Sequence, residues 1–288
     1  MFPANFGYVA AKSVDEALQL LAKHGEEGKL LAGGHSLIPA MKLRLTAPRT
    51  LIDLGTVPGL SGVKLDGSNL IIGALTVHAD VASSELVRKH MPGLADAASL
   101  IGDMQVRNRG TIGGSVAHAD PAADLPVILT ALNASFIARS SSGSRSIAAD
   151  EFFTDFYTTA MTVNEILIEI RIPLPASGSG TAYVKLPHPA SGYAVVSAGA
   201  LITRHASGSC AAARVAVGGL SSGPARAVAT EMELQGKPLT PQVIAAAAAK
   251  AAENTNPMDD AYAGAEYKRH MAAVFVRRAI EEAVRRAV

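Results

Sequence analysis

Apolar residues near the N-terminus recur with the period of an α-helix. The sequence places apolar side chains at the i, i+3, i+4, i+7 and i+8 positions of one helix face: Val14, Ala17, Leu18, Leu21 and Ala22. Ser13 and Glu16 have the spacing of a capping box, in which a hydroxyl and a carboxylate satisfy free amides at the helix start. The pattern therefore predicts a helix that begins directly after Ser13.

The next fifty residues indicate a small α/β unit. A strand-like apolar run at residues 30–32 enters the turn Gly33-Gly34, a helix-like segment follows at 37–44, and a second strand-like run covers 50–54. This order of strand, helix and strand ends near Val57.

From about residue 62 to residue 175 the sequence predicts a mixture of strands and helices. Residues 69–74 read as a strand, and residues 77–90 and 94–101 read as helices. The segment 165–172 alternates in part with period two, which places Glu165, Glu169 and Arg171 on its polar side, and it stops at Pro173.

A stretch rich in Pro, Gly and Ser at 173–181 predicts a linker between two domains. After it come strand-like runs at 192–203 and 211–220, an Ala-rich helix at 241–253 and a long helix at 263–286. The last helix carries an apolar face of Tyr267, Met271, Val274 and Phe275. We expect an α+β protein with domains at 1–176 (sub-parts about 1–57 and 58–176) and 177–288.

Composition narrows the class of protein. Hydrophobic residues make up 49% of the chain and charged residues 18%, which excludes a disordered chain. The net charge of +1 offers no basic excess for a nucleic-acid backbone. The longest apolar stretches, such as 243–249, are too short to span a bilayer, and the N-terminus lacks a signal-peptide layout. We expect a cytoplasmic protein without a membrane span.

The single cysteine, Cys210, limits the cofactors that this chain holds alone. It cannot form a disulfide within the chain, a four-cysteine zinc site or a complete cysteine-ligated iron–sulfur cluster.

Two glycine pairs with polar neighbours are the main candidates for ligand binding. They lie at Ala32-Gly33-Gly34-His35-Ser36 and at Thr111-Ile112-Gly113-Gly114-Ser115. A glycine pair in a turn lets the backbone approach a ligand closely, and its amides can point at an anion such as a phosphate. Tight turns without a ligand are the alternative. The sequence contains no phosphate-loop motif and no complete dinucleotide-binding fingerprint, so a bound dinucleotide requires another fold.

A metal site and a serine hydrolase are weaker alternatives. His118, Asp120 and Asp124 lack a recognised ligand spacing, and Asp124 reads better as an acceptor for ligand hydroxyls or as a helix N-cap. The segment Gly219-Leu220-Ser221-Ser222-Gly223 fits a nucleophile-elbow pattern, with Asp259 and His270 downstream. These two are only 11 residues apart, and no oxyanion loop is evident, so Ser221 reads as a turn residue.

The glycine segments belong to a longer pattern. The sequence resembles the FAD-binding medium subunit of molybdenum hydroxylases, the xanthine dehydrogenase and carbon monoxide dehydrogenase family. The resemblance covers essentially the whole chain in order and rests on these segments: Ala32-Gly33-Gly34-His35-Ser36-Leu37-Ile38-Pro39, Gly110-Thr111-Ile112-Gly113-Gly114, Asp120-Pro121-x-x-Asp124, Glu165-Ile166-Leu167, Tyr183-x-Lys185 and Glu266-Tyr267-Lys268-Arg269.

The resemblance implies a fold and a set of FAD contacts. The fold would be a two-part vanillyl-alcohol-oxidase-like (PCMH-type) FAD-binding domain, followed by a C-terminal domain of a small antiparallel sheet and helices. Asp124 would bond the ribityl or ribose hydroxyls, Lys185 would line the cavity as a cation near the flavin, and Tyr193 would lie near the flavin ring. The implied contacts are Ala32, Gly33, Gly34, His35, Ser36, Ile101, Gly102, Thr111, Ile112, Gly113, Gly114, Ser115, Asp124, Leu167, Lys185 and Tyr193. Ser115 stands where the family often has Asn, which shortens the reach of that contact.

The resemblance also implies partner chains. In such enzymes a large subunit hydroxylates the substrate at a molybdopterin (Mo) site, and a small subunit passes the electrons through two [2Fe-2S] clusters to FAD. FAD then passes them to an external acceptor, so this chain would carry no catalytic residue of its own. With Cys210 alone, the clusters must lie on another chain. The resemblance implies that the three subunits form a heterotrimer and that two heterotrimers pair into a dimer. A stand-alone FAD oxidoreductase is the alternative; substrate and acceptor cannot be read from this sequence.

Overall fold

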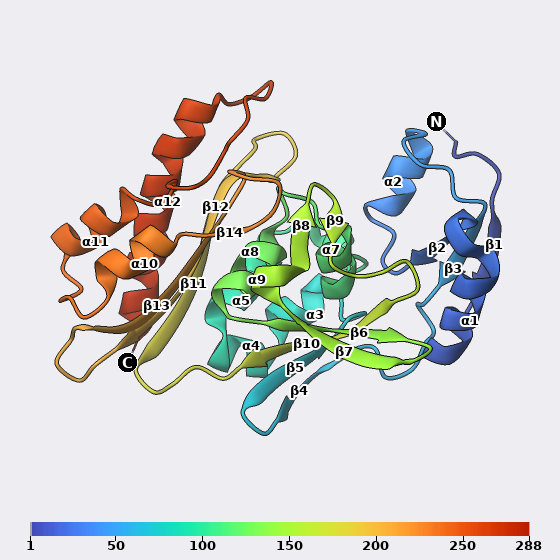
Figure 1. Cartoon of the computed structure of the whole chain (residues 1–288), viewed down its shortest axis with the longest axis horizontal. Coiled ribbons are helices and arrows are strands. Elements are labelled where there is room, and N and C mark those ends of the chain that lie inside the picture. Colours follow the sequence, from blue (N-terminus) through green and yellow to red (C-terminus); the bar gives the residue numbers. More distant parts are fainter. Residues whose placement is uncertain (1, 288) are drawn as a thin grey trace.

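The computed structural model describes residues 2–287, which form three lobes arranged in chain order (Figure 1). We call them the N-terminal lobe (β1 to β3), the middle lobe (β4 to β10) and the C-terminal lobe (β11 to α12). Sheets and helices are mixed in all three, so the predicted α+β class is confirmed.

The N-terminal lobe is a three-stranded parallel sheet in the order β1-β3-β2 with two α-helices. The predicted cap is confirmed: Ser13 Oγ accepts from the Glu16 amide at 3.1 Å, and the Glu16 carboxylate accepts from the Lys12 amide at 2.7 Å. Ala22, placed on the apolar face from sequence, is exposed. The sequence analysis does not predict the strand β1, because four residues are too few to show an alternation of apolar and polar positions. The elements are β1 (Gly7–Ala10), α1 (Val14–His24), the 3-10 turn η1 (Gly25–Glu27), β2 (Gly28–Leu31), α2 (Leu37–Lys42) and β3 (Thr50–Asp53).

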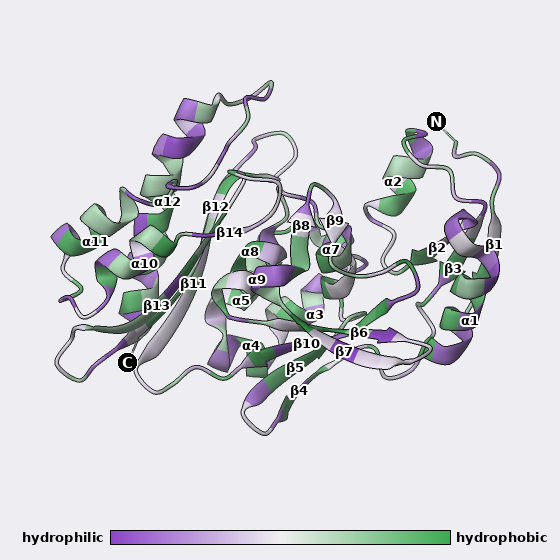
Figure 2. Ribbon diagram, viewed as in Figure 1, coloured by the Kyte–Doolittle hydropathy of each residue, from purple (hydrophilic) through white to green (hydrophobic). Residues whose placement is uncertain are grey.

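The middle lobe is built on a five-stranded antiparallel sheet in the order β4-β5-β10-β6-β7. The colouring by hydropathy shows how apolar β5 and β10 are (Figure 2). The elements in chain order are β4 (Val63–Asp66), β5 (Asn69–Gly73), α3 (His78–Ser83), α4 (Glu85–His90), α5 (Pro92–Ser99), α6 (Met104–Arg107), α7 (Ile112–His118), α8 (Asp124–Ala131), β6 (Ser135–Ser140), β7 (Gly143–Ala148), α9 (Ala149–Phe152), β8 (Phe153–Asp155), β9 (Thr158–Thr159) and β10 (Ile166–Pro173).

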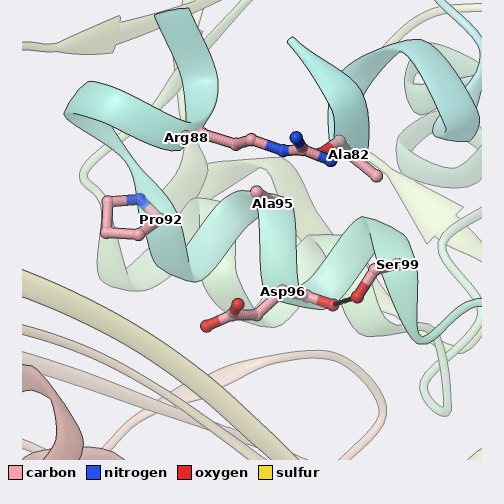
Figure 3. A pocket seen from close by; sticks show the side chains of 6 residues that line it. All are labelled: Ala82, Arg88, Pro92, Ala95, Asp96 and Ser99. Atoms are coloured by element: carbon pink, nitrogen blue, oxygen red, sulfur yellow. Dashed lines mark hydrogen bonds between the residues drawn. The ribbon is translucent and has the colours of Figure 1, made fainter. Parts of the chain in front are cut away.

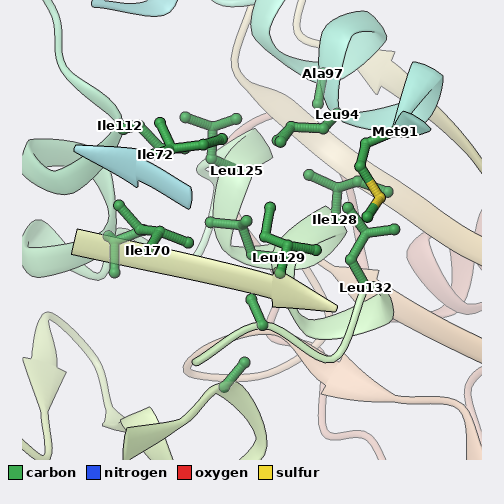
Figure 4. Close-up of a cluster of buried hydrophobic side chains, with 14 of the residues drawn as sticks. Ile72, Met91, Leu94, Ala97, Ile112, Leu125, Ile128, Leu129, Leu132 and Ile170 are labelled. Atoms are coloured by element: carbon green, nitrogen blue, oxygen red, sulfur yellow. The ribbon is translucent and has the colours of Figure 1, made fainter. Parts of the chain in front are cut away.

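The core of this lobe lies between the sheet and the helices α5 and α8. Ile72 of β5 and Ile170 of β10 meet Leu125 and Ile128 of α8 there (Figure 4). All residues of α8 are buried. The N-terminus of α8 is therefore rigidly held, and that is where Asp124 lies.

Two predictions in the middle lobe are wrong in detail. The helix predicted over 77–90 is two helices, α3 and α4, because the backbone at Ser84 turns extended (ψ 124°) and its hydroxyl caps α4. A bulge in β10 between Leu167 and Glu169 interrupts the alternation. Glu165 consequently does not lie on a solvated face: it is 8% exposed and bonds Arg145 at 2.6 Å.

The C-terminal lobe is a four-stranded antiparallel sheet, β11-β12-β13-β14, with three helices. Its strand β12 is buried almost throughout, because α12 covers one face and α8 the other. Small residues permit this close packing: a β-carbon on Gly199 would lie 3.1 Å from Ile128 Cα of α8. The elements are β11 (Ser179–Pro187), β12 (Ala194–Arg204), β13 (Cys210–Gly218), β14 (Ala225–Arg226), α10 (Val228–Leu234), α11 (Pro241–Ala248) and α12 (Ala265–Arg286).

Three details of this lobe differ from the sequence prediction. The linker is shorter than 173–181, because β10 includes Pro173 and β11 begins at Ser179. The helix α11 ends at Ala248, five residues early. On α12, Tyr267 is 46% exposed while Lys268 is buried, since its ammonium reaches Asp260 and the Met258 carbonyl. No helix within residues 2–287 is long and apolar enough to cross a membrane.

Candidate functional site

The two glycine segments, 80 positions apart in sequence, lie against each other where the turn after β2 meets the start of α7. A β-carbon on Gly33 would lie 2.8 Å from Gly110 Cα and 2.8 Å from the Arg109 carbonyl carbon. A β-carbon on Gly114 would lie 3.8 Å from Ala32 Cβ. Glycine at these positions is therefore what allows the two backbones to meet.

The first segment presents unused hydrogen-bond donors. It forms the turn predicted after β2, and Gly34 adopts a positive φ of 75°. Within residues 2–287, no acceptor receives a hydrogen bond from the amides of Gly33 to Ser36, and the Ser36 hydroxyl has no partner there either. Consecutive free amides at a glycine turn are suited to binding an anion such as a pyrophosphate.

The second segment is different from the expected turn. Gly113 and Gly114 belong to the first turn of α7, with Thr111 as its N-cap. The amides of Ile112 and Gly113 donate to the Thr76 and Ala74 carbonyls at 2.9 and 2.8 Å, and the next two amides donate to Thr111. A β-carbon on Gly113 would lie 2.5 Å from Ala74 Cβ. The prediction of a second amide-rich turn is wrong: these glycines position α7 against the first segment.

A buried polar cluster lies beyond the C-terminal end of α7. The Asp124 carboxylate is at the start of α8, and its Oδ1 accepts from the Tyr183 hydroxyl at 2.6 Å and from Lys185 Nζ at 2.8 Å. Burial raises the pKa of Asp124, and Lys185 and Tyr183 act against this shift. Burial and the nearby Asp124 charge raise the pKa of Tyr183, so its hydroxyl stays protonated and donates. The sequence analysis includes Tyr183 in the segment Tyr183-x-Lys185 but not among the implied FAD contacts, although the i, i+2 spacing places it on the same strand face as Lys185.

Three further predicted residues fall near this cluster or in the core. Lys185 also donates to the Leu100 carbonyl at 2.9 Å. Ile101 and Gly102 directly follow Leu100 in the chain, so they lie close to this cluster. Arg107 donates to the carbonyls of both residues at 3.0 Å and so fixes that loop. Leu167 lies in the core of the middle lobe and is only 6% exposed.

Tyr193 lines an open hollow of about 280 Å³ at the edge of the C-terminal lobe. Its ring is half exposed, and burial followed by the charges of Asp120, Tyr157 and Asp124 raises its pKa. The structure thus brings Tyr193 near Asp120 and Asp124. The hollow is lined by Ala122, His188, Ser191, Tyr193, Ala194, Val195, Asp260, Ala261 and Tyr262.

A second hollow, of about 290 Å³, lies on α3, α4 and α5 (Figure 3). Two side chains at its rim bond the backbone: Arg88 donates to the Ala82 carbonyl and Ser99 to the Asp96 carbonyl. None of the predicted site residues lines this hollow, so it lies outside the candidate site.

The structure adds one buried histidine near the glycine segments. His78 is 5% exposed, and its ring edge lies against Gly110, where a β-carbon would be 2.8 Å from Nε2. Burial and then the nearby His35 lower the pKa of His78 to about 4, which keeps it neutral. Its Nδ1 has no partner within residues 2–287.

Neither the metal site nor the serine hydrolase considered as alternatives is supported by the geometry of residues 2–287. Asp124 is engaged by Tyr183 and Lys185, Asp120 Oδ1 accepts from the Ala122 amide, and no group of three or more metal-ligating side chains occurs in residues 2–287. Asp259 accepts from the Ala265 amide at the start of α12. No hydrogen bond in this part of the chain joins Ser221, His270 and Asp259.

Comparison with known proteins decides the family. Residues 4–175 match the model of the FAD binding domain in molybdopterin dehydrogenase. The chain belongs to this family. Residues 181–283 match the CO dehydrogenase flavoprotein C-terminal domain. The chain is thus an FAD-binding medium subunit of the molybdenum hydroxylases, as the resemblance indicated, and FAD is its cofactor.

Relatives match over the whole length. The chain is 41% identical to the carbon monoxide dehydrogenase medium chain of Hydrogenophaga pseudoflava, with 98% of both chains covered. It is 37% identical to the 6-hydroxypseudooxynicotine dehydrogenase complex subunit alpha of Paenarthrobacter nicotinovorans, covering 100% of this chain and 97% of the relative. Among solved structures, a carbon monoxide dehydrogenase from Hydrogenophaga pseudoflava that lacks the Mo-pyranopterin moiety superposes with a TM-score of 0.96 at 42% identity, covering both chains fully.

The local geometry fits FAD. Free amides at the first glycine turn suit its pyrophosphate. The buried Asp124 carboxylate suits its hydroxyls, because within residues 2–287 no other residue donates to Oδ2. The start of α7 packs against the first glycine turn, and its end leads to the cluster around Asp124. The seven residues of α7 span about 10 Å.

Proposed function

We propose that this chain is the electron-transfer subunit of a heterotrimeric molybdenum hydroxylase. Bound FAD would accept electrons from [2Fe-2S] clusters of a small subunit and pass them to an external acceptor, while substrate is hydroxylated at a molybdopterin site on a large subunit. The observation that carries the proposal is the set of free amides at Gly33 to Ser36, held against the second glycine segment in a chain whose residues 4–175 match an FAD-binding domain.

In this proposal the glycine segments hold the pyrophosphate end of FAD. The amides and hydroxyl of residues 32–36 donate to the phosphates. In the second segment the amides of Ile112 to Ser115 are already used, so we infer that Thr111 to Ser115 shape the wall, with the Ser115 hydroxyl as the remaining donor. Serine in place of the Asn often found there makes this contact shorter in reach.

The cluster at α8 would hold the middle of FAD and the ring. Asp124 accepts from ribityl or ribose hydroxyls, and Ile101, Gly102, Leu167, Lys185 and Tyr193 would form the surrounding walls. Two Lys185 hydrogens are used by Asp124 and the Leu100 carbonyl. Its main role is therefore to keep Asp124 charged, and the positive charge near the flavin is secondary.

The fold and assembly follow the same reasoning. We propose a PCMH-type FAD-binding unit at 1–176, with sub-parts about 1–57 and 58–176, and a C-terminal domain at 177–288. The two matched segments, 4–175 and 181–283, support a boundary in that region. The single cysteine, Cys210, is buried, which supports iron–sulfur clusters on a partner chain. We propose a dimer of heterotrimers in the cytoplasm.

The substrate of the complex would be selected on the large subunit. Relatives of nearly equal identity are named for carbon monoxide and for 6-hydroxypseudooxynicotine. Both are similar to this chain along its whole length, which supports selection of the substrate outside the medium subunit.

A visible spectrum and metal analysis of the native complex test the proposal. Flavin together with iron, molybdenum and two further chains is the expected result. Flavin in a complex that contains neither metal would replace the proposal with a stand-alone FAD oxidoreductase. A native complex without flavin would overturn FAD binding itself.

A further inference from the structure

Alternate residues of β11 connect the C-terminal lobe to the middle lobe. Thr181, Tyr183 and Lys185 share one face of the strand because they are two residues apart. Thr181 Oγ1 accepts from the Gly93 amide at 3.0 Å, Tyr183 donates to Asp124 at 2.6 Å, and Lys185 donates to Asp124 and the Leu100 carbonyl. The C-terminal lobe therefore contributes directly to the surroundings of Asp124.

The two donors to Asp124 meet on the same oxygen. Tyr183 and Lys185 both donate to Oδ1, at 2.6 and 2.8 Å, and no hydrogen bond from another residue in 2–287 reaches Oδ2. Two donors at fixed angles restrict rotation of the carboxylate, and the buried ring of Tyr183, 3% exposed, cannot move away. The arrangement leaves Oδ2 held in one direction as an acceptor.

We propose that Tyr183 is a positioning residue for FAD: its hydroxyl orients Asp124 so that Oδ2 accepts from FAD hydroxyls. The proposal rests on the FAD site proposed above for Asp124. It makes cofactor affinity depend on a residue of the C-terminal lobe that is not itself a predicted FAD contact.

Loss of the Tyr183 hydroxyl has an electrostatic consequence. The titratable groups that face Asp124 are Tyr183 and Lys185 from β11 and Tyr193 from the loop before β12. Burial raises the pKa of Asp124, and both Lys185 and Tyr183 counteract this. Without the phenol, Asp124 gains a proton at a higher pH and becomes a poorer acceptor.

The test compares Tyr183→Phe with Thr181→Val in the assembled complex. Both substitutions preserve shape and remove one hydrogen bond between β11 and the middle lobe, but only the first touches Asp124. After removal of flavin, FAD is titrated back by fluorescence from pH 5 to 9. We expect Tyr183→Phe to weaken FAD binding about tenfold at neutral pH, as loss of one hydrogen bond to a charged group predicts. We expect the defect to grow at lower pH, and Thr181→Val to stay within about twofold.

Other outcomes overturn the proposal. Unchanged FAD affinity and pH profile in Tyr183→Phe would refute it, and an equal loss in both variants would attribute the effect to docking of the lobes. Wild-type complex that binds no FAD would instead refute the proposed function.

A double variant tests independently whether Tyr183 and Asp124 act through one carboxylate. Asp124→Asn should lose affinity by itself. Tyr183→Phe added to Asp124→Asn should then cause no further loss, because the two residues act through one carboxylate. A further loss of about tenfold in the double variant would contradict the proposal.

Discussion

Replacing Gly33 with alanine should push apart the two glycine segments. Gly33 is not one of the glycines with positive φ, so its backbone conformation is open to alanine. Its new β-carbon, however, would lie 2.8 Å from Gly110 Cα and from the Arg109 carbonyl carbon, and closer still to the carbonyl oxygen. These are backbone atoms, which cannot rotate away as a flexible side chain does.

The size of the effect follows from these distances. Carbon atoms in contact are normally about 3.5 Å or more apart, so the segments must separate by about 0.7 Å or more. Overpacking of this kind costs about 1–3 kcal/mol. If the free protein relieves that strain by opening, FAD binding must restore the close approach, and the dissociation constant rises by about 5- to 150-fold, since 1.4 kcal/mol corresponds to tenfold.

Titration of FAD into the deflavinated complex measures this change, and Gly59→Ala serves as the control. Gly59 lies outside the candidate site and has a φ of 78°, and a β-carbon added there would have no atom within 4 Å. We expect Gly59→Ala to lower stability by about 1–2 kcal/mol without changing FAD affinity. Wild-type FAD affinity in Gly33→Ala would refute the reasoning that close approach of the segments forms the site.

Three further predictions concern stability, thiol chemistry and the hydrolase alternative. Arg145 holds the pKa of buried Glu165 at about 2, below its usual 4.5. The pair therefore stabilises the fold above pH 4.5 and loses this effect as pH falls towards 2. The Arg145 side chain is 48% exposed, so solvent screens the pair in part. Arg145→Met should therefore lower the thermal unfolding temperature near pH 7, and the difference from wild type should shrink below pH 4; a constant difference would contradict the pairing. Burial raises the pKa of the Cys210 thiol, so an aromatic disulfide reagent should label it only after unfolding, and rapid labelling of native protein would show that the site is open. Ser221→Ala should keep wild-type flavin content and dehydrogenase activity, and a loss of activity with flavin retained would reopen the role of Ser221.

Local signals in the sequence determined much of the secondary structure. The Ser13 cap with its helix and the turn at Gly33-Gly34 appear as predicted, since capping and turn conformation depend on neighbouring residues. The apolar runs at 69–74 and 211–220 became strands within one residue or two of prediction. Short elements such as β1 and β4 escaped notice because four residues do not establish a period.

Tertiary structure decided which residues meet and what they do. Gly113 and Gly114 look like a second ligand turn in sequence, but packing against Ala74 places them in a helix whose amides are already used. Glu165 looks solvent-facing until the β10 bulge and Arg145 account for its burial. Tyr183 meets Asp124 only because the packing of the lobes brings β11 to the start of α8. Periodicity reports the environment along one element, whereas a carboxylate held by two donors from another lobe depends on how distant segments pack. The sequence alone determined the candidate glycines and their elements, and the packing of the three lobes determined the site.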